Sequence, residues 1–230
     1  MTPYLSILLK LSACFLALFL LAELLYRFAH IKATHTRKLV HIGTGVLTML
    51  FPIYFSNTWQ VVIICTSFLL LLLLSLRYRF LPSINNIDRR SAGSLLYPVI
   101  VVLVFAYYHY MSTQSLPFNA LLYFYLPILA LAIGDPTAAV AGSTVKANNS
   151  TGKKTKRGTL YFFYIVTLLS FILIYAFRLG HISFIALLLY SLVMGALTAF
   201  TERFTGGGWD NFTIPLMACA WLFILSKFLA

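Results

Sequence analysis

Charged residues are scarce in this chain, and acidic residues are scarcer still. Only 10% of its 230 residues are charged, and five of these are Asp or Glu, whereas roughly 25% of residues are charged in soluble domains. Apolar residues make up 61% of the chain, and the mean hydropathy is +0.91. A soluble fold of this composition would expose more apolar surface than so few charges could keep in water. The composition therefore excludes a soluble domain and indicates an integral membrane protein.

Cysteine is also rare, and its placement excludes two further classes of protein. Cys14, Cys65 and Cys219 each lie inside an apolar run, and no two of them have the CxxC spacing. The sequence therefore supports neither a disulfide framework nor a zinc site.

Long apolar runs are abundant, and they suggest an all-α fold. Eight runs have roughly the 17–25 residues that a membrane-spanning helix needs, and they are continuous rather than alternating, which favours helices over a β-barrel. No internal repeat or linker divides the chain, so we expect residues 1–230 to form a single domain. That domain is predicted to be a polytopic bundle of about eight transmembrane helices. The runs are approximately 4–25, 39–55, 59–76, 95–111, 118–142, 159–177, 182–201 and 212–228.

Positive charge is concentrated in alternate loops of this predicted bundle. Fourteen of the 17 Lys and Arg residues lie in loops 26–38, 77–94, 143–158 and 202–211. The positive-inside rule predicts that these loops are cytoplasmic and that both termini are on the opposite face. The net charge of +12 fits anionic headgroups or phosphorylated substrates. Nucleic-acid binding would explain the charge but none of the apolar runs.

Four of the five acidic residues are expected near the cytoplasmic ends of helices, and the fifth, Asp88, lies in loop 77–94. Glu23 lies four residues before Arg27, so an i,i+4 ion pair accounts for it. Asp135 follows Gly134 and precedes Pro136, a pattern in which Gly ends one helix, Asp caps the next and Pro opens its first turn. We therefore expect a broken helix whose second piece begins at Asp135. A capped kink is the simple interpretation, and a polar site within the membrane is the functional one.

The segment before the sixth run has the composition of a phosphate-binding loop. Its two glycines allow close approach of the backbone, its cations neutralise an anion, and the following helix offers N–H groups. Ala147 stands where a Walker A motif needs its first glycine, so the segment is not a Walker A loop. A loop that only follows the positive-inside rule would explain the cations but not the glycines and hydroxyls. The segment is Gly152-Lys153-Lys154-Thr155-Lys156-Arg157-Gly158-Thr159.

Two further cations, Arg37 and Lys38, come directly before the second run. Arg37, His41 and Gly45 share one helical face. A bound anion would relieve the conflict between these cations and the helix dipole. His41 is a candidate proton carrier or hydrogen-bond donor to phosphate, and an interhelical hydrogen bond is the alternative.

A glycine-rich turn, Gly206-Gly207-Gly208, joins the last two runs and is followed by Trp209, Asp210 and Asn211. Asp210 could simply cap the last helix. If the turn brings Asp210 back beside Glu202, the two carboxylates could instead bind Mg²⁺, which prefers oxygen ligands and substrate phosphates.

Together these segments resemble the CTP-dependent polyprenol kinase family, which includes dolichol, phytol and farnesol kinases and CTP-dependent diacylglycerol kinases. Four blocks occur in the family's order across residues 37–215. Many members have a further Gly and Arg after the second block, where this chain has Ser143 to Asn149, so CTP and another nucleotide both stay open as donor. The blocks are Arg37-Lys38-x-x-His41-x-x-x-Gly45, Gly134-Asp135-Pro136-x-Ala138-x-x-x-Gly142, Lys153-Lys154-Thr155-x-x-Gly158-Thr159 and Asp210-Asn211-x-Thr213-x-Pro215.

The resemblance implies transfer of the γ-phosphate of CTP to a membrane lipid alcohol at the cytoplasmic face. The alcohol would be an isoprenoid of the phytol, farnesol or polyprenol type, or diacylglycerol. Mg²⁺ would be held by Asp135 with Glu202 or Asp210, and Asp135 or His41 would take the hydroxyl proton. Arg37 and Lys38 would act beside them in catalysis. Nucleotide and phosphate would be bound by Gly134, Pro136, Gly142, Gly152, Lys153, Lys154, Thr155, Lys156, Gly158, Thr159 and Asn211.

Two other functions stay open at this stage. The family also resembles phosphatidate cytidylyltransferases, which use CTP to make CDP-lipid. A transporter of an anionic solute could also use broken helices with charge in the membrane. The sequence does not choose the lipid alcohol or the oligomeric state.

Overall fold

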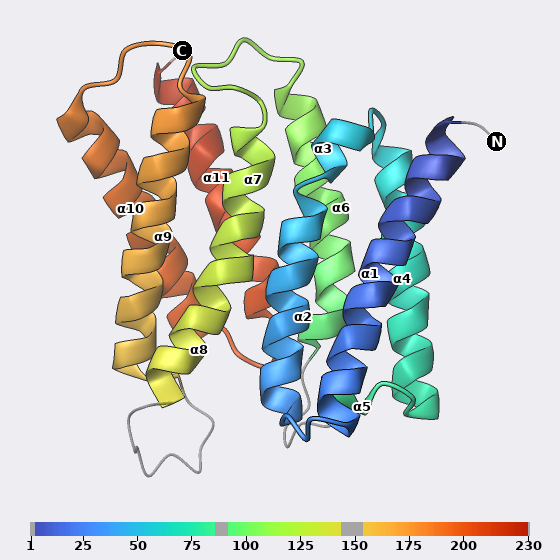
Figure 1. Cartoon of the computed structure of the whole chain (residues 1–230). Helices are drawn as coiled ribbons and strands as arrows, with labels where there is room; N and C mark the ends of the chain where they lie inside the picture. The colour runs from blue at the N-terminus through green and yellow to red at the C-terminus, as the bar shows by residue number, and fades with distance from the viewer. Residues whose placement is uncertain (1–2, 86–91, 144–153, 230) are drawn as a thin grey trace.

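The computed structural model describes residues 3–85, 92–143 and 154–229 (Figure 1). Its regular elements are all helices across these three ranges, as the sequence predicts. The long helices form an upright bundle, and short helices cover parts of its two ends. The elements are α1 (Pro3–Arg27), α2 (Ala33–Thr48), α3 (Phe51–Tyr54), α4 (Thr58–Tyr78), α5 (Pro82–Asn85), α6 (Gly93–Met111), α7 (Leu122–Leu129), η1 (Ala130–Gly134), α8 (Asp135–Ser143), α9 (Lys156–Phe177), α10 (Phe184–Phe204) and α11 (Asp210–Leu229).

The fold class predicted from composition is confirmed. In the described part of the chain, seven helical segments are long and apolar enough to cross a membrane, with α7, η1 and α8 counted as one. The predicted run 39–55 is divided between α2, which has 16 residues, and the four-residue α3. Pro52 lies in the first turn of α3, where proline is tolerated, whereas it could not continue the hydrogen-bond ladder of α2. The second predicted span is therefore a 16-residue helix followed by a turn, and it is not among the seven candidate spans of the described residues.

The interruption predicted near Gly134 is a π-helical turn, η1, rather than a gap in the helix. Asp135 has helical backbone angles, and its N–H bonds to the Leu131 carbonyl. Pro136 has no N–H for the carbonyl four residues earlier, so the regular ladder cannot pass through it. A π turn re-routes the hydrogen bonds and keeps the chain helical. Asp135 thus begins α8 directly after η1, inside the bundle.

The described residues of the four sequence blocks lie toward one end of the bundle. This end carries the starts of α2, α6, α9 and α11 and the ends of α8 and α10 (Figure 1), and we call it the motif end. The first and last described residues, at the start of α1 and the end of α11, lie at the opposite end. The motif end and the ends of the described chain are therefore at opposite ends of the bundle, as the positive-inside rule predicts. The side of the membrane that the motif end faces stays a prediction.

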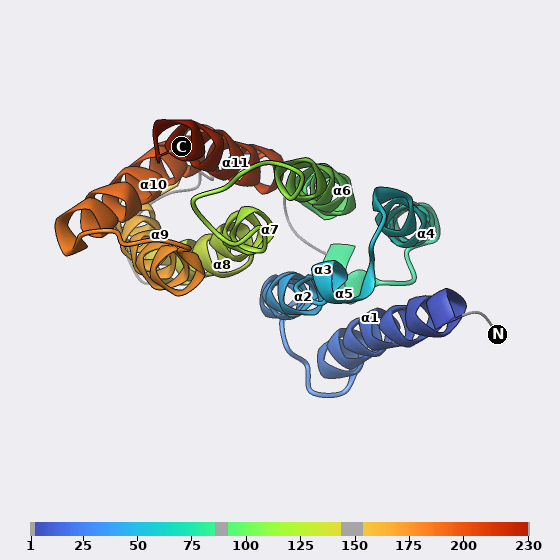
Figure 2. The same cartoon turned by 90° about the horizontal axis from the view of Figure 1, so that it is seen from above.

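Several glycines of the blocks allow helices to pack closely. A Cβ at Gly45 of α2 would lie 2.2 Å from the Cβ of Ala132 in η1, and one at Gly158 of α9 would lie 2.8 Å from the carbonyl oxygen of Ala138 in α8. Figure 2, a view along the bundle, shows α1, α2, α4 and α6 on one side and α8 to α11 on the other, with α7 between them. Because Gly45 has no side chain, the two sides of the bundle can pack closely at the π turn.

Candidate functional site

A buried ionic cluster forms the centre of the motif end. The Lys154 Nζ lies 2.9 Å from Glu202 Oε1 and 2.8 Å from Asp210 Oδ2. Glu202 is 3% exposed and Asp210 is 6% exposed. Thr159 Oγ1 donates to the other Glu202 oxygen at 3.0 Å. One ammonium group therefore pairs with two carboxylates that are almost completely removed from solvent.

The glycine turn brings the two carboxylates together, as the sequence analysis anticipated. Glu202 lies in the last turn of α10 rather than in the predicted loop 202–211, and Asp210 is the first residue of α11. Gly207 and Gly208 between them have φ values of 66° and 91°, a region that favours glycine. The reversal of the chain therefore depends on glycine at these positions.

Lys154 is held in place from two directions. Arg203 Nη1 donates a hydrogen bond to its backbone carbonyl, and Asp210 and Glu202 bind its ammonium group. Burial lowers the pKa of Lys154, but the charges of Asp210 and Glu202 outweigh it, and the net effect raises the pKa above its ordinary value. Lys154 is therefore a cation at neutral pH.

Asp135 and His41 lie beside this cluster. Asp135 lies close enough to interact electrostatically with Asp210, His41, Lys154 and Glu202. His41 Nε2 lies 3.3 Å from the carbonyl oxygen of Leu131 in η1, so the interhelical hydrogen bond that the sequence left as an alternative is present. The Gly-Asp-Pro block and the lysine-rich block therefore meet at one place.

The remaining cations of the blocks are distributed around the cluster. Lys38 is half-buried and interacts electrostatically with Asp135. Arg37 lines the cavity described below, and Lys156 is exposed in the first turn of α9. Gly152 and Lys153, which we predicted to bind phosphate, lie outside the described residues.

Several residues predicted to bind phosphate have structural contacts in the bundle. Thr155 caps α9, with its Oγ1 accepting the Gly158 N–H at 3.1 Å. A Cβ at Gly142 would lie 2.8 Å from the same Oγ1, and a Cβ at Gly134 would lie 2.8 Å from the Phe162 ring. These contacts explain the glycines by helix packing, and their contact with phosphate stays a prediction. The buried Pro136 lies in the first turn of α8.

The carboxylates of the cluster suit Mg²⁺ in their chemistry. Glu202 and Asp210 direct one oxygen each toward a single cation, Lys154, and Mg²⁺ is commonly held by one or two carboxylates with substrate phosphates. Within the described ranges, no three His, Cys, Asp or Glu side chains form a ready metal site. Glu202 and Asp210 therefore fit the metal as a pair, and the metal-binding role predicted for Asp135 stays a prediction.

An apolar cavity opens beside the cluster, between α1, α2, α4 and α6. It has about 710 Å³ of empty space, counting the part that is open to the surroundings. Its polar lining residues at the motif end are Arg37, His41, Ser94 and Asn211. Asn211 donates from Nδ2 to the Gly93 carbonyl at 2.8 Å and directly follows Asp210, so it borders both the cavity and the cluster.

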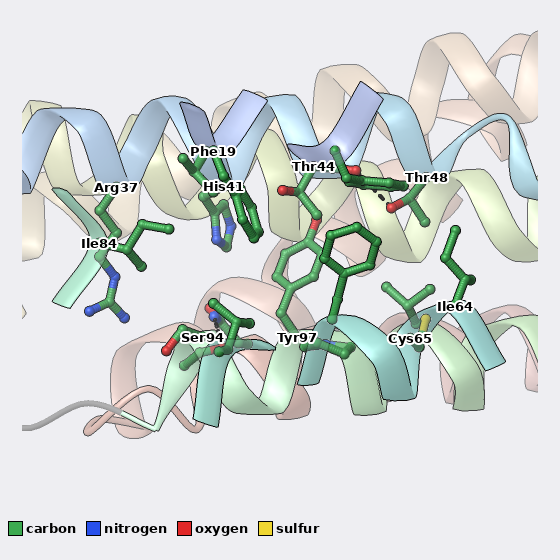
Figure 3. Close-up of a pocket in the computed structure, with 18 of the residues that line it drawn as sticks. Phe19, Arg37, His41, Thr44, Thr48, Ile64, Cys65, Ile84, Ser94 and Tyr97 are labelled. Atoms are coloured by element: carbon green, nitrogen blue, oxygen red, sulfur yellow. Dashed lines mark hydrogen bonds between the residues drawn. The ribbon is translucent and has the colours of Figure 1, made fainter. Parts of the chain in front are cut away.

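Two lining residues, Thr44 and Tyr97, were missed by the sequence analysis. Arg37, His41, Thr44 and Thr48 are spaced so that they follow one face of α2, and all four line the cavity (Figure 3). This polar stripe in an apolar run was a signal in the sequence. Nothing comparable marked Tyr97, because its importance depends on the packing of α6 against α2.

Glu23 has the role that the sequence favoured for it. It forms an ion pair with Arg27, and it also accepts a hydrogen bond from the Ser83 N–H at 3.2 Å. It therefore links α1 to α5 and takes no part in the cluster.

The fold and the site together define a polytopic helical membrane protein with a buried ionic cluster beside an apolar cavity. The chain is 30% identical over 204 residues to a phytol kinase of Synechocystis sp., an alignment that covers 87% of this chain and 83% of that protein. The chain belongs to the polyprenol and phytol kinase-like family. No family model and no solved structure matches it.

Proposed function

We propose that this protein is a lipid-alcohol kinase that transfers the γ-phosphate of CTP to an isoprenoid alcohol of the phytol type. The observation that carries the proposal is the shared border at Asn211, where the charged cluster adjoins an apolar cavity. A phosphate donor is hydrophilic and an isoprenoid is not, so an enzyme that joins them needs these two environments side by side. The phytol kinase relative supports the acceptor class, and the four sequence blocks support the nucleotide.

The residues of the motif end suit phosphoryl transfer, which depends mainly on positioning and on neutralising charge. Glu202 and Asp210 would hold Mg²⁺, which neutralises charge on the triphosphate when bound. Lys154, released from the carboxylates, would then bind phosphate oxygens, with Arg37 and Lys38 as further cations. Both of these lie on the first turns of α2, at the same end of the bundle.

Proton removal from the alcohol would fall to Asp135 or His41. These two groups lie close enough to interact electrostatically, and His41 also lines the cavity. As the proton leaves, the alcohol oxygen bonds to the γ-phosphorus, the bond to the β-phosphate oxygen breaks, and CDP departs. The cytoplasmic location of this reaction follows from the positive-inside rule.

The proposal is tested by finding which labelled phosphate of the nucleotide appears on the lipid. Purified protein in lipid vesicles would be incubated with Mg²⁺ and with phytol, farnesol, a polyprenol or diacylglycerol, together with CTP labelled at the γ- or the α-phosphate. We expect γ-label, and no α-label, on an isoprenoid alcohol, and we expect a lower rate with ATP. With phosphatidate as acceptor, α-label on lipid would identify a cytidylyltransferase. Uptake of anions into vesicles without nucleotide turnover would identify a transporter, and either result would overturn the proposal.

A further inference from the structure

Two hydroxyl groups in the cavity have no hydrogen-bond partner among the described residues. They are the Tyr97 OH and the Thr44 Oγ1, and both atoms are removed from solvent. Tyr97 as a whole is only 6% exposed. Buried polar atoms nearly always have a partner, so each unpaired one needs an explanation. A pair of them lining one cavity indicates a ligand that supplies the missing hydrogen bonds.

The two hydroxyls lie near each other, close to His41. Tyr97 extends from α6 toward α2, and its OH approaches Thr44 (Figure 3). The same OH lies 2.9 Å from the position that a Cβ on Gly45 would occupy. The rings of Tyr97 and His41 are in edge-to-face contact, with centroids 5.0 Å apart. A ligand group held by Tyr97 and Thr44 would therefore lie beside His41.

The rest of the cavity is apolar and runs away from the motif end. Thr48 lies 11 residues beyond Arg37 on α2, a distance of about 16 Å along the helix. The walls along this stretch consist mainly of aromatic and aliphatic side chains, and Ile64 and Cys65 line the end opposite Arg37 (Figure 3). Such walls favour a hydrocarbon chain over a polar group. The apolar lining includes Phe15, Phe19, Phe51, Phe68, Leu72 and Val101.

We propose that Tyr97 and Thr44 bind the hydroxyl of the lipid alcohol and that the apolar part of the cavity holds its chain. An alcohol oxygen has one proton to donate and two lone pairs, so it can accept from the Tyr97 OH and donate to the Thr44 Oγ1. The second lone pair stays free to attack phosphorus, and the proton shared with Thr44 Oγ1 is the one that Asp135 or His41 takes as the new bond forms. This inference rests on the proposed function, since it names the acceptor subsite of the same reaction.

Removing each hydroxyl separately tests the subsite. We expect Tyr97→Phe and Thr44→Val each to raise the KM for phytol about tenfold, while the KM for CTP stays within about twofold. Thr44→Ser keeps the hydroxyl and should stay close to wild type. Tyr4→Phe and Thr167→Val are matched controls, because these residues also have buried, unpaired hydroxyls but do not line the cavity. Unchanged KM values for phytol in both cavity variants would overturn the inference.

A binding measurement separates this inference from the proposed function. Radiolabelled phytol would be bound to purified protein in nanodiscs without nucleotide, and Ile64→Trp would be used to fill the far end of the cavity. We expect saturable binding that Tyr97→Phe weakens about tenfold and that Ile64→Trp abolishes. Phosphorylation of phytol with binding unaffected by Ile64→Trp and Tyr97→Phe would refute the subsite alone. Binding with the expected sensitivity, but no phosphorylation of any alcohol, would refute the kinase alone.

Discussion

At Lys154, one ammonium group pairs with two carboxylates that come from different helices. Glu202 lies in the last turn of α10 and Asp210 begins α11, so the lysine joins these two helices through its ion pairs. Removing one partner of a buried ionic group is costly because the remaining charges stay buried and uncompensated.

Lys154→Met should therefore destabilise the protein by about 3–5 kcal/mol, measured as the free energy of unfolding in detergent. Lys156→Met is the matched control for stability, because Lys156 is exposed two residues further along the chain. The double variant Lys154→Met with Glu202→Gln should regain part of the lost stability, since one of the unpaired charges is removed. Wild-type stability in Lys154→Met would show that the cluster contributes nothing to the fold.

Asp135→Asn should reduce phosphoryl transfer by a factor of about 10² or more, the size of effect associated with general acid–base catalysis. The change preserves the shape of the side chain, so expression and thermal unfolding should stay near wild type. Glu23→Gln serves as a control because Glu23 pairs with Arg27 outside the cluster, and its turnover should be unchanged. Turnover of Asp135→Asn close to that of wild type would remove this residue from the mechanism.

At the scale of elements, the contact between α2 and η1 places His41 opposite the carbonyl of Leu131. The contact is possible because Gly45 has no side chain, and its Cα faces Ala132 directly. The sequence located the irregularity at Gly134-Asp135-Pro136 correctly but not its form. A gap and a π turn both satisfy the constraint from Pro136, and only the packing of neighbouring helices chooses between them.

Gly45→Ala should push α2 away from η1, because the new Cβ would lie 2.2 Å from the Cβ of Ala132. Overpacking of this kind costs about 1–3 kcal/mol, and the displaced His41 should lower turnover as well. Thermal unfolding and phosphoryl-transfer rates would both be measured. Gly43→Ala is the control on the same helix, since its Cβ would meet only the movable side chain of Leu18. Equal effects of the two substitutions would contradict the role given to Gly45.

At the scale of the whole molecule, the charge asymmetry predicts how the bundle sits in the membrane. The described loops with the most cations adjoin the motif end, and both termini are at the other end (Figure 1). Translocating a cationic loop is disfavoured, so the motif end should face the cytoplasm.

Single cysteines introduced at the two ends would test this orientation. After replacement of the three native cysteines, Gln114→Cys lies between α6 and α7 at the end with the termini, and Lys32→Cys lies before α2 at the motif end. Both positions are exposed. A membrane-impermeant maleimide applied to intact cells should label Gln114→Cys, whereas Lys32→Cys should react only after permeabilisation. The reverse pattern would move the site to the other face.

The sequence alone determined the helical membrane fold and the gathering of charged blocks at one end. Both depend on local composition: apolar runs of membrane length must become helices in lipid, and loop charge follows the positive-inside rule. It also offered the approach of Glu202 to Asp210 as one of two possibilities, because a flexible three-glycine turn permits this approach without requiring it. The bridging of both carboxylates by Lys154, the π turn and the unpaired hydroxyls of Thr44 and Tyr97 were decided only by the tertiary structure. Each depends on which helix faces which, and periodicity within one helix carries no information about its neighbours.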